Sequence, residues 1–485
     1  MQVKNGTILD TLKKEKKNRN ILFHQRASFF DAVILEEIST MRRYFTKQPA
    51  LHDTEVINTI KQWSYPLQSK AGLQPLLDRI GDARIVMLGE ASHGTHEYYT
   101  WRSHISKRLI EEKGFNFLAV EGDWPDCYRL NRFVKGYDIN SKSAYNVLHA
   151  FNRWPTWMWA NWEIVALADW LLLHNKRLSA DKKVGFYGLD MYSLRESLDS
   201  IMQYLKKTDP AALKIAEEAF RCFEPYKKDE GHSYARASQF VPELCENEVV
   251  ELLKEISRKL PQYNTDHENV FNAEQNAVIT VNAEKYYRAM IAGGPHSWNI
   301  RDRHMADTLN RLLSFHGNNS KAIVWEHNTH IGDARATDMI NDGMYNIGEL
   351  ARTEHSDKGV ALVGFGSYKG TVMAGGGWGG TMNKMQLPEA RKGSWEYLLH
   401  QAGPENKLLL MEDFAGNDAL MENHIGHRAV GVIYQPQYEQ YGNYVPSILP
   451  LRYDAFIYLD ETHALHPLHI QPDGHQVPET YPFGV

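Results

Sequence analysis

The 485-residue sequence predicts an α/β protein with a mostly parallel sheet core, flanking helices and a large helical insertion. Short apolar runs rich in β-branched residues recur along the chain, as in the buried strands of a parallel sheet. Helical patterns lie between these runs, and such alternation is typical of α/β architecture. A long stretch, about 193–320, lacks strand-like runs and is rich in Lys, Glu, Gln and Ala, which predicts a helical subdomain.

The composition is that of a globular protein. Hydrophobic residues make up 43% and charged residues 24% of the chain, which excludes a disordered chain, a collagen-like repeat and a disulfide-rich miniprotein. The 54 Lys and Arg residues against 60 Asp and Glu residues give a net charge of −6, so we expect no nucleic-acid partner. The count of 22 histidines is high, and histidine is both the side chain that titrates near neutral pH and the commonest metal ligand.

The sequence predicts four segments along the chain. They are an N-terminal helical extension (1–50), a first part of the α/β catalytic core (51–192), the helical subdomain (193–320) and a second part of the core (321–485). The apolar stretch 21–38 is too short and too charged for a signal or membrane helix, so we expect no membrane partner. Three widely spaced cysteines, Cys127, Cys222 and Cys245, suggest a reducing compartment without a disulfide framework, and we expect a cytoplasmic protein.

The predicted strands are the apolar runs 83–90, 115–122, 183–190, 321–328, 359–366, 408–413, 429–436 and 455–460. Helical spacing relates Tyr98, Arg102, Ile105 and Leu109, and it recurs from Met305 to Leu313 and over 246–260 and 269–292. Ligands of an open parallel sheet bind beyond the carboxyl ends of its strands. Most of the early strands end in an acidic residue, and two are followed by paired histidines, which favours a site at that edge.

Glu90 and His93 lie three residues apart at a predicted strand-to-helix turn. A carboxylate beside an imidazole fixes its tautomer and raises its basicity, as general-base catalysis requires. The structural alternative is that Glu90 caps the following helix and His93 is a polar turn residue. Glu121 ends an apolar strand, where a carboxylate is either partnered in the interior or part of a site, and we favour the site.

His327 and His330 form a second pair at a strand end, and catalytic, metal-binding and structural roles all stay open for them. With His93 and His96 they would suit a zinc site, although neither pair lies in an HExxH motif. A third histidine run, His463, His466 and His469, is interpreted as surface, with metal binding as the alternative.

Aromatic and glycine-rich segments add weaker indications. Trp154, Trp157, Trp159 and Trp162 are interpreted mainly as core packing, with a cleft for an apolar ligand as the alternative. Trp124 suits a pocket wall or the core equally. The run 375–380 satisfies GxGxxG, but no helix opens after it, so we interpret it as a mobile loop that could act as a lid.

Four segments carry a resemblance to the erythromycin esterase family, whose members have also been labelled succinoglycan biosynthesis proteins. They are LGEASHGTHEYYTWR (88–102), VEGDW (120–124), WEHNTHIGDAR (325–335) and GFGSYKGTVMA (364–374). The resemblance covers roughly residues 54–470. It implies an α/β core with a helical subdomain and a hydrolytic cleft at the strand ends. It also implies a metal-independent mechanism without a cofactor, in which histidine-activated water opens an ester or macrolactone substrate. A role in the response to macrolide antibiotics is part of the same implication.

Matched residue by residue, the resemblance implies that His93 is the water-activating histidine and Glu90 the acid before it. It implies a site role for Arg102, which the sequence alone does not single out, and for Glu121, His327 and His330. We therefore expect His93 to take a proton from water, Glu90 or Glu121 to orient it, and Arg102, His327 and His330 to position substrate or stabilise the oxyanion.

Two other functions stay open at this point. One is a metal-dependent hydrolase that uses the same histidines as ligands, and the other is a non-catalytic small-molecule or haem-binding protein. The sequence decides neither the substrate nor the oligomeric state.

Overall fold

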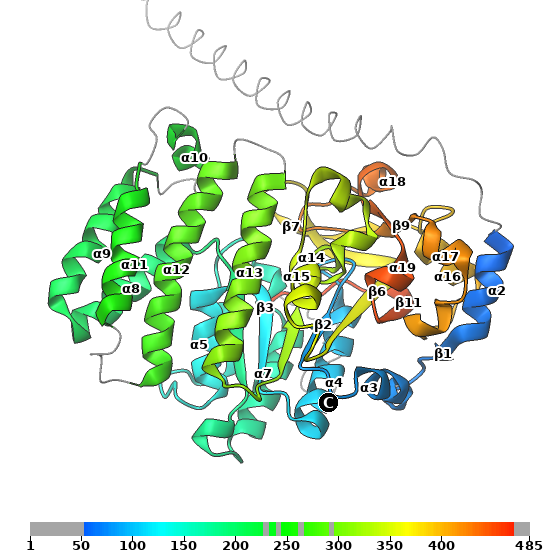
Figure 1. The fold of residues 1–485 in the computed structure, drawn as a ribbon, viewed down its shortest axis with the longest axis horizontal. Helices are drawn as coiled ribbons and strands as arrows, with labels where there is room; N and C mark the ends of the chain where they lie inside the picture. The colour runs from blue at the N-terminus through cyan, green and yellow to red at the C-terminus, as the bar shows by residue number, and fades with distance from the viewer. Residues whose placement is uncertain (1–52, 227–231, 239–243, 260–265, 291–294, 470–485) are drawn as a thin grey trace, which may run out of the picture.

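A computed structural model describes residues 53–469, apart from 227–231, 239–243, 260–265 and 291–294. A nine-stranded sheet forms its centre, in the order β1-β8-β11-β6-β2-β5-β3-β4, with β7 paired to β6 (Figure 1). The strands are β1 (Ser64–Pro66), β2 (Ile85–Leu88), β3 (Phe117–Asp123), β4 (Gly185–Asp190), β5 (Ala322–Trp325), β6 (Val360–Gly375), β7 (Met382–Leu387), β8 (Lys407–Leu410) and β11 (Ala455–Thr462). A separate pair joins β9 (Ile425–Arg428) and β10 (Tyr444–Ser447).

Every neighbouring pair from β11 to β4 is parallel, whereas β1, β7 and β8 add antiparallel pairings. The predicted α/β class with a mostly parallel sheet is confirmed. The strands β2, β3, β4 and β5 are adjacent in the sheet, so their carboxyl ends lie at one edge. The polar residues that follow them are thereby brought together.

The predicted strand over 429–436 is wrong. The segment makes only isolated bridges, from Val430 to Ser92 and from Ile433 to Gly375. Its backbone is satisfied by loops instead of a strand ladder: the N–H of Val430 donates to the carbonyl of Ala91, and the carbonyl of Val432 accepts from Gly375. An apolar run can therefore cross the end of a sheet without joining it.

Helices cover both faces of the sheet. One face carries α3 (Gln74–Ile80), α4 (His96–Lys113), α6 (Ala144–His149) and α7 (Trp162–Asn175) in one apolar cluster. The other carries α2 (Asp53–Trp63), α13 (Pro295–Phe315), α15 (Ile347–Glu354) and α16 (Trp395–Gln401), and α5 (Trp124–Val134) contributes to both clusters. Four short helices lie in the connections that follow β5, β8, β9 and β10: α14 (Asn328–Ile331), α17 (Asp418–Glu422), α18 (Glu439–Gly442) and α19 (Leu449–Arg452).

The remaining helices form a stack with an apolar cluster of its own. They are α8 (Leu194–Thr208), α9 (Pro210–Phe223), α10 (His232–Ser238), α11 (Glu246–Lys259) and α12 (His267–Met290), coloured green at one side of Figure 1. All fall within the predicted helical stretch. The predicted domain limits stay predictions, and the extension 1–50 lies outside the described residues.

A disulfide joins Cys222 at the end of α9 to Cys245 just before α11, with a Cα–Cα distance of 5.9 Å. The expectation of no disulfide is wrong, because antiparallel helix packing brings together cysteines 23 residues apart. Cys127 is free and buried. The bond removes the cysteine argument for a reducing compartment.

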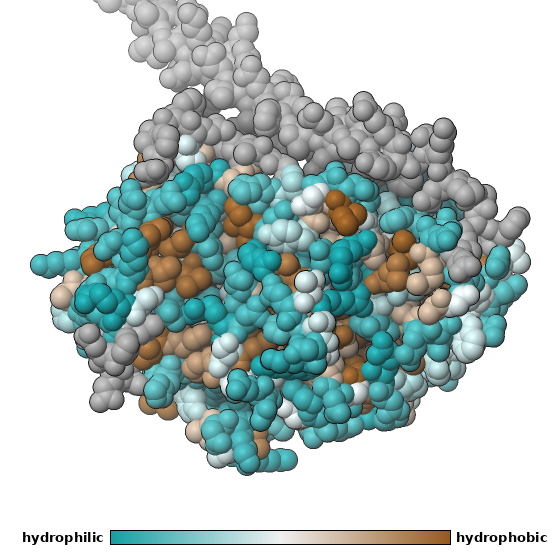
Figure 2. Space-filling view, viewed as in Figure 1, coloured by the Kyte–Doolittle hydropathy of each residue, from teal (hydrophilic) through white to brown (hydrophobic). Residues whose placement is uncertain are grey.

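The surface is mixed in character. Figure 2 shows a mostly hydrophilic face with small apolar groups interspersed, as is ordinary for globular proteins. Among the described residues, no helix combines the length and the apolar character that crossing a membrane requires.

Candidate active site

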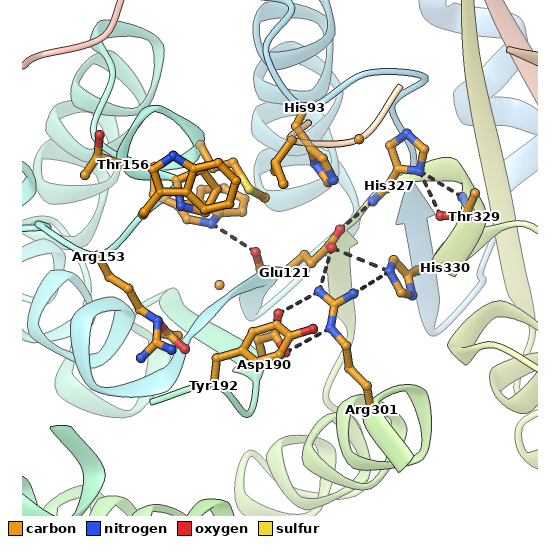
Figure 3. A pocket seen from close by; sticks show the side chains of 18 of the residues that line it. His93, Glu121, Arg153, Thr156, Asp190, Tyr192, Arg301, His327, Thr329 and His330 are labelled. Atoms are coloured by element: carbon orange, nitrogen blue, oxygen red, sulfur yellow. Dashed lines mark hydrogen bonds and ion pairs between the residues drawn. The ribbon is translucent and has the colours of Figure 1, made fainter. Parts of the chain in front are cut away.

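A cavity of about 440 Å³ opens where β2, β3, β4 and β5 end (Figure 3). Its polar lining includes His93, Glu121, Asp123, Asp190, Arg301, His327 and His330. The predicted residues His93, Glu121, His327 and His330 therefore meet in one cavity, as the strand-end argument requires. Glu90 and Arg102 do not line it and lie behind His93.

His93 is held by a buried chain of polar contacts from the β2–α4 loop. Its Nδ1 lies 3.0 Å from Glu90 Oε1, and Arg102 Nη2 donates to Glu90 Oε2 at 2.5 Å. Arg102 and Glu90 are almost fully buried, and the guanidinium lies over the rings of Tyr99 and Trp325. With Nδ1 directed to Glu90, the Nε2 of His93 is the ring nitrogen left for a substrate or water.

Backbone packing fixes the position of this loop. A Cβ built on Gly94 would lie 1.9 Å from the carbonyl oxygen of Met373, so only glycine allows the loop to approach β6 so closely. The N–H of Met373 in turn donates to the carbonyl of Gly94. The residue next to His93 is thus locked against the sheet.

The charges around His93 raise the pKa of its imidazole. Burial opposes its protonation, but the negative charge of Glu121 and the hydrogen bond to Glu90 outweigh burial and raise the pKa of His93 above its ordinary value. A higher pKa makes the neutral imidazole a stronger proton acceptor, which favours a base at this position.

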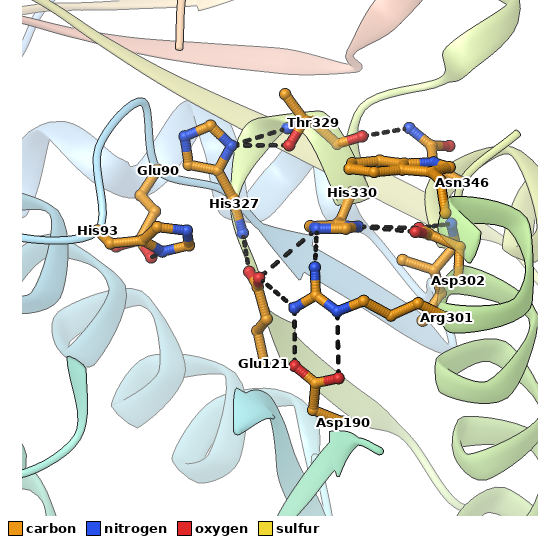
Figure 4. A network of polar contacts seen from close by, with 12 residues as sticks. Glu90, His93, Glu121, Asp190, Arg301, Asp302, His327, Thr329, His330 and Asn346 are labelled. Carbon is orange, nitrogen blue, oxygen red and sulfur yellow. Dashed lines mark hydrogen bonds and ion pairs between the residues drawn. The ribbon is translucent and has the colours of Figure 1, made fainter. Parts of the chain in front are cut away.

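Glu121 is the centre of a wider network (Figure 4). Its Oε1 accepts from Arg301 Nη2 at 2.7 Å, and its Oε2 accepts from the backbone N–H of His327 at 2.8 Å. Burial would raise the pKa of Glu121, but His330, His93 and Arg301 together hold it far below its usual range. Glu121 is therefore a carboxylate whose charge is shared among fixed partners.

His327 presents a neutral imidazole with one nitrogen unused. Its Nδ1 accepts the N–H of Thr329 at 3.3 Å, so a neutral ring carries its proton on Nε2. Burial and the neighbouring His93 hold the pKa of His327 well below its ordinary value, against smaller opposing effects of Glu121 and the Ala91 carbonyl. The Nε2 is buried and has no hydrogen-bond partner among the described residues. The rings of His93 and His327 lie 4.8 Å apart.

His330 differs from His327 in having both nitrogens engaged. Nδ1 lies 2.9 Å from Asp302 Oδ1, and Nε2 lies 2.8 Å from Arg301 Nη1. The ring stacks on Trp298 at a centroid distance of 4.5 Å. A histidine fixed on three sides in this way suits a role in positioning Arg301 and Glu121.

The sequence prediction missed Arg301, Asp302 and the pairing of Asp190. Arg301 forms two bonds to Asp190, at 2.7 and 3.1 Å, and so ties helix α13 to the ends of β3 and β4. One pattern pointed to them: Asp302 occupies a position on the apolar stripe of Met305, Leu309 and Leu312, where an acid needs a buried partner.

Two further acids near the cavity are strongly perturbed. Asp123 pairs with Arg153 at 3.2 Å, yet burial raises its pKa to about 7. Glu326 is fully buried with neither carboxylate oxygen bonded to a described residue, and burial raises its pKa well above the usual range.

Aromatic side chains form the apolar wall. Trp154 and Trp159 line the cavity, as does Trp378 from the glycine-rich loop between β6 and β7. The rings of Trp154 and Trp378 lie 4.8 Å apart, and Trp154 Nε1 donates to the carbonyl of Gly380. Trp157 and Trp124 are buried in the core, so the predicted tryptophan cluster divides between wall and core.

His96 does not line the cavity. Its Nδ1 lies 2.6 Å from Glu163, on α7, instead of meeting His93, His327 and His330. A zinc site made of both HxxH pairs is therefore not formed.

Comparisons with known proteins show which proteins this chain resembles. The family model described as Erythromycin esterase matches residues 110–462, beginning after Glu90, His93 and Arg102. The erythromycin esterase type II of Escherichia coli is 24% identical over 376 residues, covering 72% of this chain and 86% of the relative. A putative hydrolase of Bacillus subtilis strain 168, YbfO, is 24% identical over 401 residues, covering 78% and 83%.

Solved structures share the fold. A Bacillus cereus protein superposes with a TM-score of 0.72 at 21% identity, covering 87% of this chain and all of that chain. A succinoglycan biosynthesis protein gives 0.70 at 20% identity, covering 86% and 100%. A mutant of the erythromycin esterase EreC in its open conformation gives 0.61 at 16%, covering 81% and 94%. Since the family model spans most of the chain, the protein belongs to the erythromycin esterase family.

Proposed function

We propose that this protein is a hydrolase that cleaves an ester or macrolactone with a water molecule activated by His93. The observation that carries the proposal is that two histidines with pKa values shifted in opposite directions lie side by side in the cavity lining. His93 is paired with Glu90 and has a raised pKa, whereas His327, 4.8 Å away, is neutral with an unpartnered Nε2. One suits a base and the other a hydrogen-bond donor.

In the proposed reaction the water oxygen attacks the ester carbonyl carbon while His93 Nε2 takes the water proton. The carbonyl oxygen becomes an oxyanion, to which the Nε2–H of His327 donates. The tetrahedral intermediate then breaks its bond to the alkoxy oxygen, which receives the proton from His93. The products are a carboxylic acid and an alcohol, or one hydroxy acid when the substrate is a lactone.

The remaining predicted residues act as positioning residues in this scheme. Arg102 donates to Glu90 Oε2 and holds that side chain in place against His93. Glu121 stabilises the positive imidazolium of His93 that forms during attack, since its charge raises the pKa of that ring. His330, between Asp302 and Arg301, holds the network around Glu121.

The position of Arg301 weighs against a metal ion shared by the same histidines. Its guanidinium lies 2.7 Å from Glu121 and 2.8 Å from His330 Nε2, where a metal bound by those residues would need to be. A fixed cation is already paired with both Glu121 and Asp190. A bound metal ion that is lost on His327→Ala or His330→Ala substitution would contradict this view.

The wall of tryptophans suits a substrate with a large apolar surface. Together with the relatives named for erythromycin hydrolysis, it supports a macrolide or similar natural lactone as substrate and a role in the response to such antibiotics.

Kinetics of a His93→Asn variant test the proposal. General-base catalysis contributes about 10²- to 10⁴-fold, so we expect kcat on a responsive ester to fall at least about a hundredfold. His174→Asn, a half-buried histidine on α7 outside the cavity, is the matched control and should keep full activity. A folded His93→Asn protein with unchanged kcat would overturn the assignment.

A further inference from the structure

A second histidine–carboxylate cluster lies outside the cavity. His96 Nδ1 and His466 Nδ1 lie 2.6 and 2.7 Å from the same atom, Glu163 Oε1. One ligand-capable atom from each residue lies within 4.8 Å of the other two. The three side chains thus converge on one point.

The three side chains come from separate parts of the chain that the backbone holds together. His96 is the first residue of α4, Glu163 the second of α7, and His466 follows β11. The N–H of His96 donates to the carbonyl of His463, and the N–H of Trp162 donates to that of His466. The positions are therefore set before any ligand arrives.

The side chains of the cluster are of the types that bind metal ions. Both imidazoles direct Nδ1 at one oxygen of the Glu163 side chain, Oε1. Its second oxygen, Oε2, is buried and has no hydrogen-bond partner among the described residues. The Glu163 side chain is 1% exposed, whereas that of His466 is 36% exposed and leaves one side open to water. Two imidazoles, one carboxylate and an open position match the His₂Glu type of zinc site.

The geometry needs little adjustment to accept an ion. Bonds of about 2.0–2.1 Å in a tetrahedron place ligand atoms roughly 3.3 Å apart. The present distances of 2.6 and 2.7 Å are shorter, so each pair has to separate by less than about 1 Å. Each imidazole would move its Nδ1 proton to Nε2 and offer the Nδ1 lone pair.

We propose that His96, Glu163 and His466 bind one divalent transition-metal ion, with zinc the best match to the ligands and water in the fourth position. This site is distinct from the proposed catalytic cavity. It would fasten the segment after β11 to the loop that carries His93, because Leu465 N–H already donates to the carbonyl of Gly94. The ion would act on stability of that loop and take no part in the proposed reaction.

Metal titration of the whole protein tests the proposal. Protein stripped with chelator is titrated with zinc by calorimetry and with cobalt by visible absorption, whose intense bands report four-coordinate geometry. We expect one ion per chain, and at least a tenfold loss of affinity in His466→Ala and in Glu163→Gln. Circular dichroism shows whether each variant is folded, and the partly exposed His466 keeps the test usable if Glu163→Gln does not fold.

The same histidine run provides the controls. His463 bonds to Glu97, and His469 bonds to the carbonyl of His149, so His463→Ala and His469→Ala should bind zinc as the unmodified protein does. Absence of zinc and cobalt binding by the unmodified protein would overturn the proposal. Binding that survives in folded His466→Ala, or that the control substitutions remove equally, would overturn it too.

Discussion

Arg102 forms a buried ion pair with Glu90 that should contribute strongly to stability. It is 0% exposed and is the cation bonded to the buried Glu90. Replacing it by Met leaves a carboxylate buried without a counter-charge, which we expect to lower the free energy of unfolding by about 3–5 kcal/mol. Arg108→Met on the same helix removes a partly exposed pair with Glu112 and should cost below about 1 kcal/mol. Urea unfolding measures both, and equal small losses would contradict the account.

Asp123 should make stability depend on pH. Burial raises its pKa from 3.8 to about 7, so between these values the folded protein binds a proton that the unfolded chain has released. Stability relative to an Asp123→Asn variant should therefore be greatest below about pH 4, fall between pH 4 and 7, and level off above 7. The shift corresponds to at most about 4 kcal/mol.

Thermal unfolding at a series of pH values tests the Asp123 prediction. Asp78→Asn, at an exposed position of α3, is the control and should leave the pH profile unchanged. A difference between the unmodified protein and Asp123→Asn that is constant from pH 4 to 7 would show that Asp123 is ionised throughout.

At this scale the sequence predicted the residues that terminate strands but not those that a helix supplies. Glu121 lies near the end of β3, and the other four residues follow β2 or β5: Glu90, His93, His327 and His330. The carboxyl edge of the sheet brings all five together. Arg301 comes from α13, and no local pattern tells which strand end a helix reaches. Arg102 was indicated by resemblance alone, since a charged residue on a helix is usually solvated.

Among the elements, the glycine-rich loop between β6 and β7 contributes Trp378 to the cavity wall. Its ring is 52% exposed in the free protein and packs on Trp154. Trp378→Ala should lower kcat/KM for a bulky lactone about tenfold, since apolar contact with substrate is lost, and leave a small acetate ester unaffected. Trp63→Ala, a comparably exposed tryptophan on α2, is the control. Equal effects on both substrates would contradict a role in binding large substrates.

The disulfide belongs to the helical stack and not to the catalytic core. It closes a segment between residues 23 apart, which in the chain-entropy model stabilises the folded state by about 3 kcal/mol. Cys222→Ser with Cys245→Ser should lower the free energy of unfolding by about that amount and leave kcat unchanged. Chemical denaturation and an ester assay on the same preparation measure the two quantities. A large fall in kcat would show that the stack governs the site.

The positions of strands along the chain were predicted more reliably than the contacts that each segment makes. Apolar runs located the strands of the parallel core because those strands are buried on both faces. The run 429–436 has the same composition but lies across loops, and composition does not distinguish these settings. The pairing of Cys222 with Cys245 depends on how two helices pack, which spacing alone does not reveal.

For the whole molecule, the fold class followed from alternation of strands and helices, whereas the strand order did not. Placement of β5 between β2 and β3 brings His327 next to both His93 and Glu121, although more than 200 residues separate Glu121 from His327. The site is thus a product of topology, because the strand order brings together motifs that lie far apart in the sequence.

The most direct test of the central claim, that His93 activates water for ester cleavage, is mass spectrometry of products formed in water labelled with heavy oxygen. Macrolides and other natural lactones are incubated with the unmodified protein and with folded His93→Asn. The account predicts a product heavier by one water, with one heavy oxygen in its new carboxylate, from the unmodified protein only. Formation of the labelled product at an equal rate by His93→Asn, or no water-added product from any ester or lactone, would contradict it.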